Sequence, residues 1–176
     1  DRLSKYDGTT WSVVTGTNIP IPRSAVVPVG DRLLCATTNG IERTDPRVDS
    51  VWSANSSWAT LRPKQAGLFT ALHPVSMKST DSILDGALAF QERAYYLIHG
   101  TDYGDDVTEA APPEGENVSF QCLDTSVGTN SPYSICNVPG IGMFWFTADA
   151  NIYWIPEGGL TGRYIGDKLQ STVATL

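Results

Sequence analysis

The sequence is poor in the residues from which most metal and catalytic sites are built. Its 176 residues include two histidines, His73 and His99, and three cysteines, Cys35, Cys122 and Cys136. The cysteines are odd in number, widely spaced and without a Cys-x-x-Cys pair, so they predict neither a disulfide framework nor a zinc site. We expect them to be buried, reduced thiols of a protein made in a cytosol.

Motifs that carry catalysis are missing as well. The sequence has no Gly-x-Ser-x-Gly nucleophile turn and no glycine-rich phosphate-binding loop. His73 precedes Pro74 and is expected in a loop, whereas His99 ends an apolar run. A histidine base needs a nucleophile and an orienting partner, and the local sequence proposes neither. We therefore expect structural roles for both histidines, no cofactor, no metal and no enzymatic activity.

Long apolar runs and positive charge are also scarce. The longest apolar run is far too short to span a bilayer. The net charge is −7, from 12 basic and 19 acidic residues, which argues against a surface that binds nucleic acid by neutralising phosphates. It does not exclude a surface that DNA passes without being held. Because the first residue is Asp1 and not Met, we expect the chain to be cut from a longer protein.

The abundant residues are those that form turns and buried strands. The 16 glycines and 11 prolines interrupt the chain at short intervals, and no long segment has a 3.6-residue period. A hydrophobic content of 41% indicates one globular domain, residues 1–176. Strand–turn–strand patterns are expected over 5–14, with the turn at Asp7-Gly8, over 24–45, with one strand at Arg32 to Ala36, and over 87–104, with a turn at Gln91-Glu92. A further strand is expected at 118–124. A short helix is expected over 168–176.

The stretch GIGMFWFTADANIYWIPEGG, residues 140–159, does not alternate apolar and polar residues as a surface hairpin does. Met143–Phe146 and Ile152–Ile155 are apolar at every position, which predicts a hairpin covered on both faces. A β-sandwich is the rival interpretation, although its strands usually keep one polar face.

Strand, tight turn and apolar strand recur at about 50 to 60 residues, at Val29–Leu34, Phe90–Tyr95 and Pro139–Phe144. Such a period is typical of β-propeller blades, which stack face to face. We therefore expect an all-β, propeller-like fold with roughly three blades, which is part of a larger ring because closed propellers have four or more.

Two segments interrupt this pattern. The polar span 49–67 carries Trp52 and Trp58, and the acidic span 100–117 contains a Pro-Pro pair, which predicts a projecting loop. The acidic residues of the loop could bind calcium, but their spacing does not match an EF-hand, and a solvated loop is the simpler interpretation.

SKYDGTTW, residues 4–11, is similar to the Asp-box turn of sialidase propellers, and IPIPR, residues 19–23, faintly resembles the Phe-Arg-Ile-Pro motif of that family. In the first the spacing differs, and in the second the order. The arginine trio and tyrosine nucleophile of sialidases cannot be assigned either, so an active glycosidase is not the favoured interpretation.

More of the chain resembles the propeller domains of tailed-bacteriophage tail and connector proteins. The matching stretches are LSKYDGTTW, VGDRLLCATTNGIERTDPRVDSVWS, LFTALHPV, GALAFQERAYYLI and SVGTNSPYSICNVPGIGMFWFTADANIYWI. The family includes packaged-DNA stabilisation, head-closure and nozzle proteins of short-tailed phages. In the family a glycine often follows the turn's aspartate, whereas this chain has Ala150-Asn151 and Asn tolerates the same positive φ.

The resemblance implies a structural virion protein, without a catalytic centre, that forms part of the neck or tail channel. Its partners would be copies of itself in a symmetric ring, neighbouring neck or tail proteins, and DNA that passes without specific binding. Trp52 and Trp58 could anchor contacts with neighbours, although packing between blades is the alternative for both. Two other functions stay open: a secreted or cell-surface carbohydrate-binding or glycosidase propeller, and a receptor-binding module at the tail tip.

Overall fold

The protein is built from antiparallel β-strands. A computed structural model describes residues 3–16, 19–24, 26–30, 32–38, 40–44, 52, 67–78, 83–99 and 119–166. The strands in chain order are β1 (Ser4–Tyr6), β2 (Trp11–Val13), β3 (Val26–Val29), β4 (Arg32–Ala36), β5 (Ile41–Arg43), β6 (Ala71–Lys78), β7 (Ile83–Phe90), β8 (Tyr95–His99), β9 (Ser119–Asp124), β10 (Cys136–Val138), β11 (Gly142–Phe146), β12 (Ile152–Pro156) and β13 (Arg163–Tyr164). A 3-10 helix, η1, spans Pro132–Ser134, and the described residues contain no α-helix. The all-β prediction is therefore confirmed.

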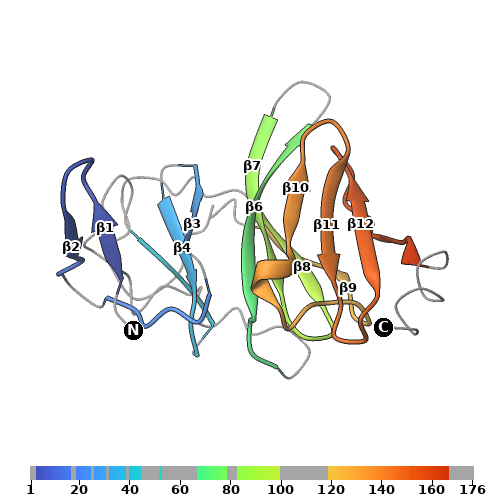
Figure 1. Ribbon diagram of the computed structural model, residues 1–176, viewed down its shortest axis with the longest axis horizontal. Coiled ribbons are helices and arrows are strands. Elements are labelled where there is room, and N and C mark those ends of the chain that lie inside the picture. The colour runs from blue at the N-terminus through green and yellow to red at the C-terminus, as the bar shows by residue number, and fades with distance from the viewer. Residues whose placement is uncertain are drawn as a thin grey trace.

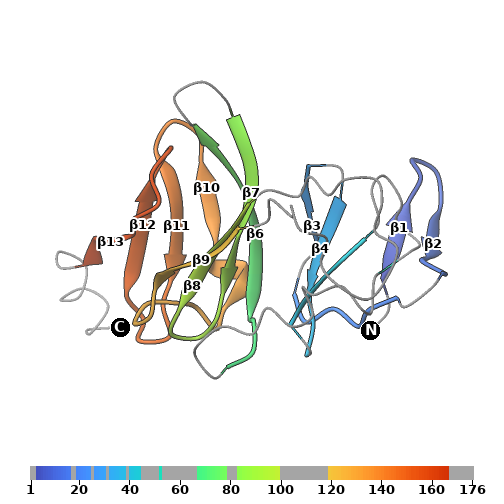
Figure 2. The ribbon, with the colours of Figure 1, turned by 180° about the vertical axis from the view of Figure 1, so that it is seen from behind.

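The strands form four sheets that follow the order of the chain. β1–β2 is a hairpin, β3–β4–β5 has three strands, and β6–β7–β8–β9 and β10–β11–β12–β13 have four strands each. Every neighbouring pair is antiparallel, so each sheet is a meander. The sheets lie in a row, with β1–β2 at one end and β12–β13 at the other (Figures 1 and 2).

The middle sheet β6–β9 is covered on both faces. Side chains alternate along its central strands: Ala87, Ala89, Tyr96 and Ile98 pack with sheet β3–β5, whereas Leu88, Phe90, Tyr95 and Leu97 pack with sheet β10–β13. All eight are buried. Because neither face meets water, β7 and β8 need no polar alternation, which explains the apolar runs of this sequence region.

Sheet β10–β13 has one covered and one open face. Met143, Trp145 and Ile155 are buried against the middle sheet, with Tyr153 partly buried beside them. On the other face Phe146 keeps 48% of its surface exposed. The prediction that hairpin 140–159 is covered on both faces thus holds for one face within the described part of the chain.

A buried polar connection fixes the turn between β7 and β8. The Gln91 backbone N–H donates to Ala94 O at 2.8 Å, and the Thr129 N–H donates to Gln91 O at 2.8 Å. The buried Gln91 amide donates to Gly67 O at 2.8 Å and accepts from the Tyr96 hydroxyl at 3.1 Å. Residues 127–129 are thereby held against the middle sheet before the chain enters the last sheet.

Two sequence predictions are wrong in detail. His73 and Pro74 lie in strand β6 and not in a loop. β6 is an edge strand, where the missing proline N–H breaks no ladder on the open side. The three recurring turns are also not equivalent, because those at Gly30 and Gly140 join the first two strands of their sheets, whereas Gln91-Glu92 joins the second and third.

Candidate functional site

A groove of about 450 Å³ crosses one end of the three stacked sheets. Its described lining combines prolines and glycines with an apolar floor and three polar side chains: Pro28, Gly30, Pro74, Val75, Ser76, Gly86, Leu88, Asn137, Gly142, Met143, Ile155, Pro156, Glu157, Gly158, Gly159 and Leu160. The edge strands β3 and β6 supply Pro28 and Pro74, which block the addition of a further strand there.

Glu157 is the single ionisable residue in that lining. Glycoside hydrolysis uses two carboxylates, or a tyrosine nucleophile with a carboxylate partner, and the lining offers one carboxylate. Neither His73 in β6 nor His99 at the end of β8 belongs to it. The described residues also contain no group of three or more His, Cys, Asp or Glu placed to hold a metal ion. That the chain has no enzymatic activity stays a prediction.

The open face of sheet β10–β13 is a second candidate surface. Cys136 pairs with Phe144, Phe144 with Trp154, and Trp154 with Arg163, so one row of side chains crosses all four strands on this face. The rings of Phe144 and Trp154 stack with centroids 6.3 Å apart. Phe146 pairs with Ile152 in the next row on the same face. Together with Ile165, which is exposed beyond β13, these residues form an apolar surface with a basic residue at its edge, which we call the outer face.

Hairpin β1–β2 carries another exposed apolar surface in the part of the chain that the structure describes. Tyr6 pairs with Trp11 and Ser4 with Val13, which places these four side chains on one face of the hairpin. Tyr6, Trp11 and Val13 keep 53%, 70% and 47% of their surfaces exposed, and the two rings lie 5.2 Å apart. This surface is not among the candidates predicted from the sequence, although the alternation of apolar and polar residues in the two strands carries the signal for it.

The turn of that hairpin is stabilised locally. The Asp7 carboxylate accepts from the N–H groups of Thr9 and Thr10, both at 2.8 Å, and Gly8 has φ 98°. These two hydrogen bonds hold the pKa of Asp7 below its usual 3.8. The predicted hairpin with its Asp7-Gly8 turn is therefore confirmed, and it carries a negative charge at its tip.

The cysteines differ from the expectation of three buried thiols. Cys35 is buried, and burial, aided by the charge of Glu42, raises the pKa of its thiol to about 12. Cys122 and Cys136 are exposed. All three are free, so the predicted absence of a disulfide framework agrees with the structure, whereas the predicted burial holds for Cys35 alone.

The residues proposed as interface anchors lie in a region that the structure describes only in part. Trp52 forms a β-bridge with Thr44 and keeps 1% of its surface exposed, so within this chain it packs inside the fold. Trp58, the rest of the polar span except Gly67, the acidic loop 100–117 and the expected helix 168–176 lie outside the described residues. Contacts of Trp52 and Trp58 with neighbours stay a prediction.

Comparison of the chain with protein-family models, with curated proteins and with solved structures found no match. In the described residues, no helix is long and apolar enough to cross a membrane. The stacked sheets and the two exposed apolar surfaces of the described residues are the features that bear on function.

Proposed function

We propose that the chain is a structural protein of a tailed-phage virion that forms part of the channel in the neck or tail. The observation that carries the proposal is the middle sheet, which is a four-stranded meander covered by other meanders on both faces. Such packing supports the proposal because each face of a propeller blade meets a neighbouring blade. The resemblance of the sequence to phage connector and tail propellers spans most of the chain, and its most specific stretch, residues 126–155, contains β10 and β11 and most of β12.

The finer fold in this proposal is a propeller-like ring. Three consecutive meanders, β3–β5, β6–β9 and β10–β13, act as successive blades. The edge strands β3 and β6 and the short β10 contribute to one groove at the end of the stack. In a ring, the first strands of the blades would face the axis. The row of sheets in Figure 1 would then be an arc that further blades or further copies complete.

Charge supports a channel wall better than a DNA clamp. The net charge of −7 repels the phosphate backbone, so DNA would slide past the wall and not be held by it. Function would then depend on contacts between subunits, which fits the uncovered aromatic residues of the outer face and of hairpin β1–β2.

Electron microscopy of purified virions, with mass spectrometry of separated heads and tails, tests the proposal. We expect the protein in the neck or tail fraction, in a ring of sixfold or twelvefold symmetry on the phage axis. A protein absent from virions would overturn the proposal. In that case a glycan array would test the alternative of a carbohydrate-binding propeller.

A further inference from the structure

Hairpin β1–β2, at one end of the molecule, has no buried residue in its two strands. Its six strand residues are all exposed, including the aromatic pair Tyr6 and Trp11. Lys5 and Ser12 occupy the opposite face, so the hairpin is amphipathic and its apolar face is exposed together with its polar one. A two-stranded hairpin is marginally stable in water unless its apolar face is packed. The hairpin therefore has a face suited to packing on another apolar surface.

The outer face of sheet β10–β13 is also apolar and partly exposed, at the other end of the molecule. Within the chain, the equivalent face of the middle sheet is covered by a neighbouring sheet. On the middle sheet the pairs Leu88–Leu97 and Phe90–Tyr95 face sheet β10–β13 and are fully covered by it. In hairpin β11–β12 the corresponding pairs are Phe144–Trp154 and Phe146–Ile152, and these remain partly exposed.

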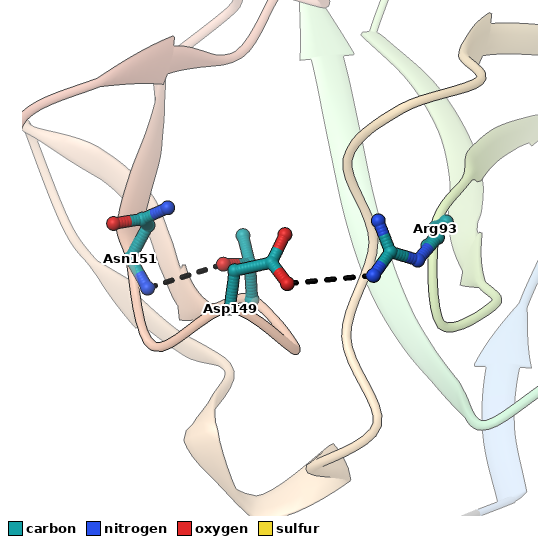
Figure 3. A network of polar contacts seen from close by, with 4 residues as sticks. Arg93, Asp149 and Asn151 are labelled. Carbon is teal, nitrogen blue, oxygen red and sulfur yellow. Dashed lines mark hydrogen bonds and ion pairs between the residues drawn. The ribbon is translucent and has the colours of Figure 1, made fainter.

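The correspondence between the two hairpins is visible where their turns meet. Arg93, in the turn after β7, and Asp149, in the turn after β11, approach each other with Nη2 and Oδ1 3.4 Å apart (Figure 3). The backbone N–H of Asn151 closes the second turn by donating to the Thr147 hydroxyl at 3.1 Å. Equivalent turns thus lie side by side, and the outer face corresponds to a face that this fold covers elsewhere.

The two uncovered surfaces lie at opposite ends of the row of sheets, so they cannot meet within one copy (Figures 1 and 2). We propose that the apolar face of hairpin β1–β2 docks on the outer face of sheet β10–β13 of a second copy of this chain, head to tail. This contact rests on the proposed assembly of copies and identifies the surfaces through which they join. Head-to-tail contacts between identical subunits form a ring when the rotation closes and a filament when it does not.

Charge and size fit a weak contact that becomes stable by repetition. Asp7 at the hairpin tip is negative, and the exposed Arg163 at the edge of the outer face is positive. The contact would centre on Trp11 and Trp154, since tryptophan is enriched among residues that dominate binding. A short hairpin covers less area than a standard stable interface, so single contacts would dissociate readily and ring closure would strengthen them.

Crosslinking with a short bis-maleimide traps such a contact. Cys136 already lies on the outer face, and Ser4→Cys adds a thiol to the apolar face of the hairpin. Both thiols are placed in a Cys122→Ser background of the full chain, which removes the other exposed cysteine. Head-to-tail docking predicts a ladder of dimers, trimers and larger species, in which mass spectrometry of the crosslinked peptides identifies a linkage between position 4 of one copy and Cys136 of the next.

Two variants and two controls complete the test. Trp11→Ser and Trp154→Ser should each reduce the ladder about tenfold or more, whereas Ile21→Ser, an exposed apolar residue on neither surface, should leave it unchanged. Circular dichroism verifies folding, and Trp11, at 70% exposure, is the safer variant. A crosslinked dimer from Cys136 without Ser4→Cys would indicate face-to-face pairing and would overturn the proposal, as would a monomer under all conditions. A ladder from a protein absent from virions would instead leave the contact intact and refute the virion function.

Discussion

The middle sheet and the C-terminal sheet are built alike but are covered differently. Both are four-stranded antiparallel meanders with apolar residues on both faces of their central hairpin. In the middle sheet both sets are buried, whereas in the C-terminal sheet Trp145 is buried and Phe144 and Trp154 on the opposite face are only partly so. The exposed face of the C-terminal sheet therefore carries large apolar residues like those of a buried face, and the contact between copies that we propose would cover it.

Replacing one tryptophan on each face of the C-terminal sheet should show most clearly that one face is buried and the other is not. Trp145 keeps 1% exposure and packs on Phe90 and Tyr95, with ring centroids 5.4 and 5.5 Å away. Trp145→Ala should therefore lower the free energy of unfolding by about 3–5 kcal/mol. Trp154→Ala, on the outer face, should cost the isolated chain much less. Urea unfolding of both variants is the measurement, and equal losses would contradict the distinction between the two faces.

A methyl group at Gly128 should weaken the contact between the middle sheet and the segment that leads to the last sheet. A Cβ on Gly128 would lie 2.0 Å from Gln91 O and 2.6 Å from Ala94 N, both backbone atoms that cannot rotate away. We expect Gly128→Ala to lower the free energy of unfolding by roughly 1–3 kcal/mol or more, because the Thr129–Gln91 hydrogen bond must shift.

The control for Gly128 is Gly158, in the turn after β12. A Cβ there meets nothing within 4 Å, although φ is 73°. Gly158→Ala should cost only the strain of a left-handed alanine, about 1–2 kcal/mol. If Gly128→Ala were as stable as the wild type, the close approach of residues 128 and 91 would be wrong.

The loss of stability at alkaline pH should reflect the burial of a tyrosine on each face of the middle sheet. Tyr96 faces sheet β3–β5 and Tyr95 faces sheet β10–β13. Burial is the main cause that raises the pKa of both phenols above 10.0, that of Tyr96 to about 12, and burial also raises the pKa of the Cys35 thiol to about 12. These groups therefore stay protonated to a higher pH in the folded state than in the unfolded state.

The sign of the pH effect follows from that order. The stabilising contribution is complete below the unfolded-state pKa values, near 9.0 for the thiol and 10.0 for the phenols, and is lost as the pH rises toward about 12. The melting temperature should therefore fall with increasing slope above pH 9, and Tyr96→Phe should reduce that slope.

At pH 8 a thiol reagent should label Cys122 and Cys136 quickly and Cys35 only after unfolding.

Much of the fold could be predicted because its signals are local. The strand Arg32–Ala36 and the Asp7-Gly8 turn were identified from apolar runs and from residues with defined turn chemistry. Strand β6 was missed because Pro74 was interpreted as a loop residue, and the rule that edge strands tolerate proline needs the sheet order. Without β6, its sheet lost its first strand, and the turn at Gln91-Glu92 was aligned with the wrong turns.

The candidate surfaces were less predictable. The alternation around Tyr6 and Trp11 shows that one face of the hairpin is apolar, but whether that face is covered depends on packing between distant segments. The same holds for Phe144 and Trp154, whose sequence reads as a covered strand. Local patterns thus fixed which residues share a face, and only the arrangement of the sheets decided which faces meet a neighbour within the chain.

The smallest predicted effect concerns the two equivalent turns. Gln91–Ala94 closes with one hydrogen bond and needs no positive φ, whereas in Thr147–Asn151 the Thr147 N–H donates to Asn151 O at 2.9 Å and the Ala150 N–H to Thr147 O at 3.1 Å. This is a type I turn with one further residue in the left-handed region. That residue is Ala150, with φ 59°, and not Asn151, to which the sequence analysis assigned the positive φ.

Ala150→Gly should therefore stabilise the protein by about 0.5–1 kcal/mol, since relief of the left-handed alanine exceeds the added freedom of the unfolded chain. Asn151→Gly, one residue later, should destabilise it by roughly 0.5–1 kcal/mol, because Asn151 has no positive φ and glycine adds unfolded-state entropy. Thermal unfolding of the two variants side by side is the measurement. Stabilisation by Asn151→Gly in place of Ala150→Gly would show that the turn of the C-terminal sheet is shifted by one residue, and with it the assignment of Phe146 and Ile152 to the outer face.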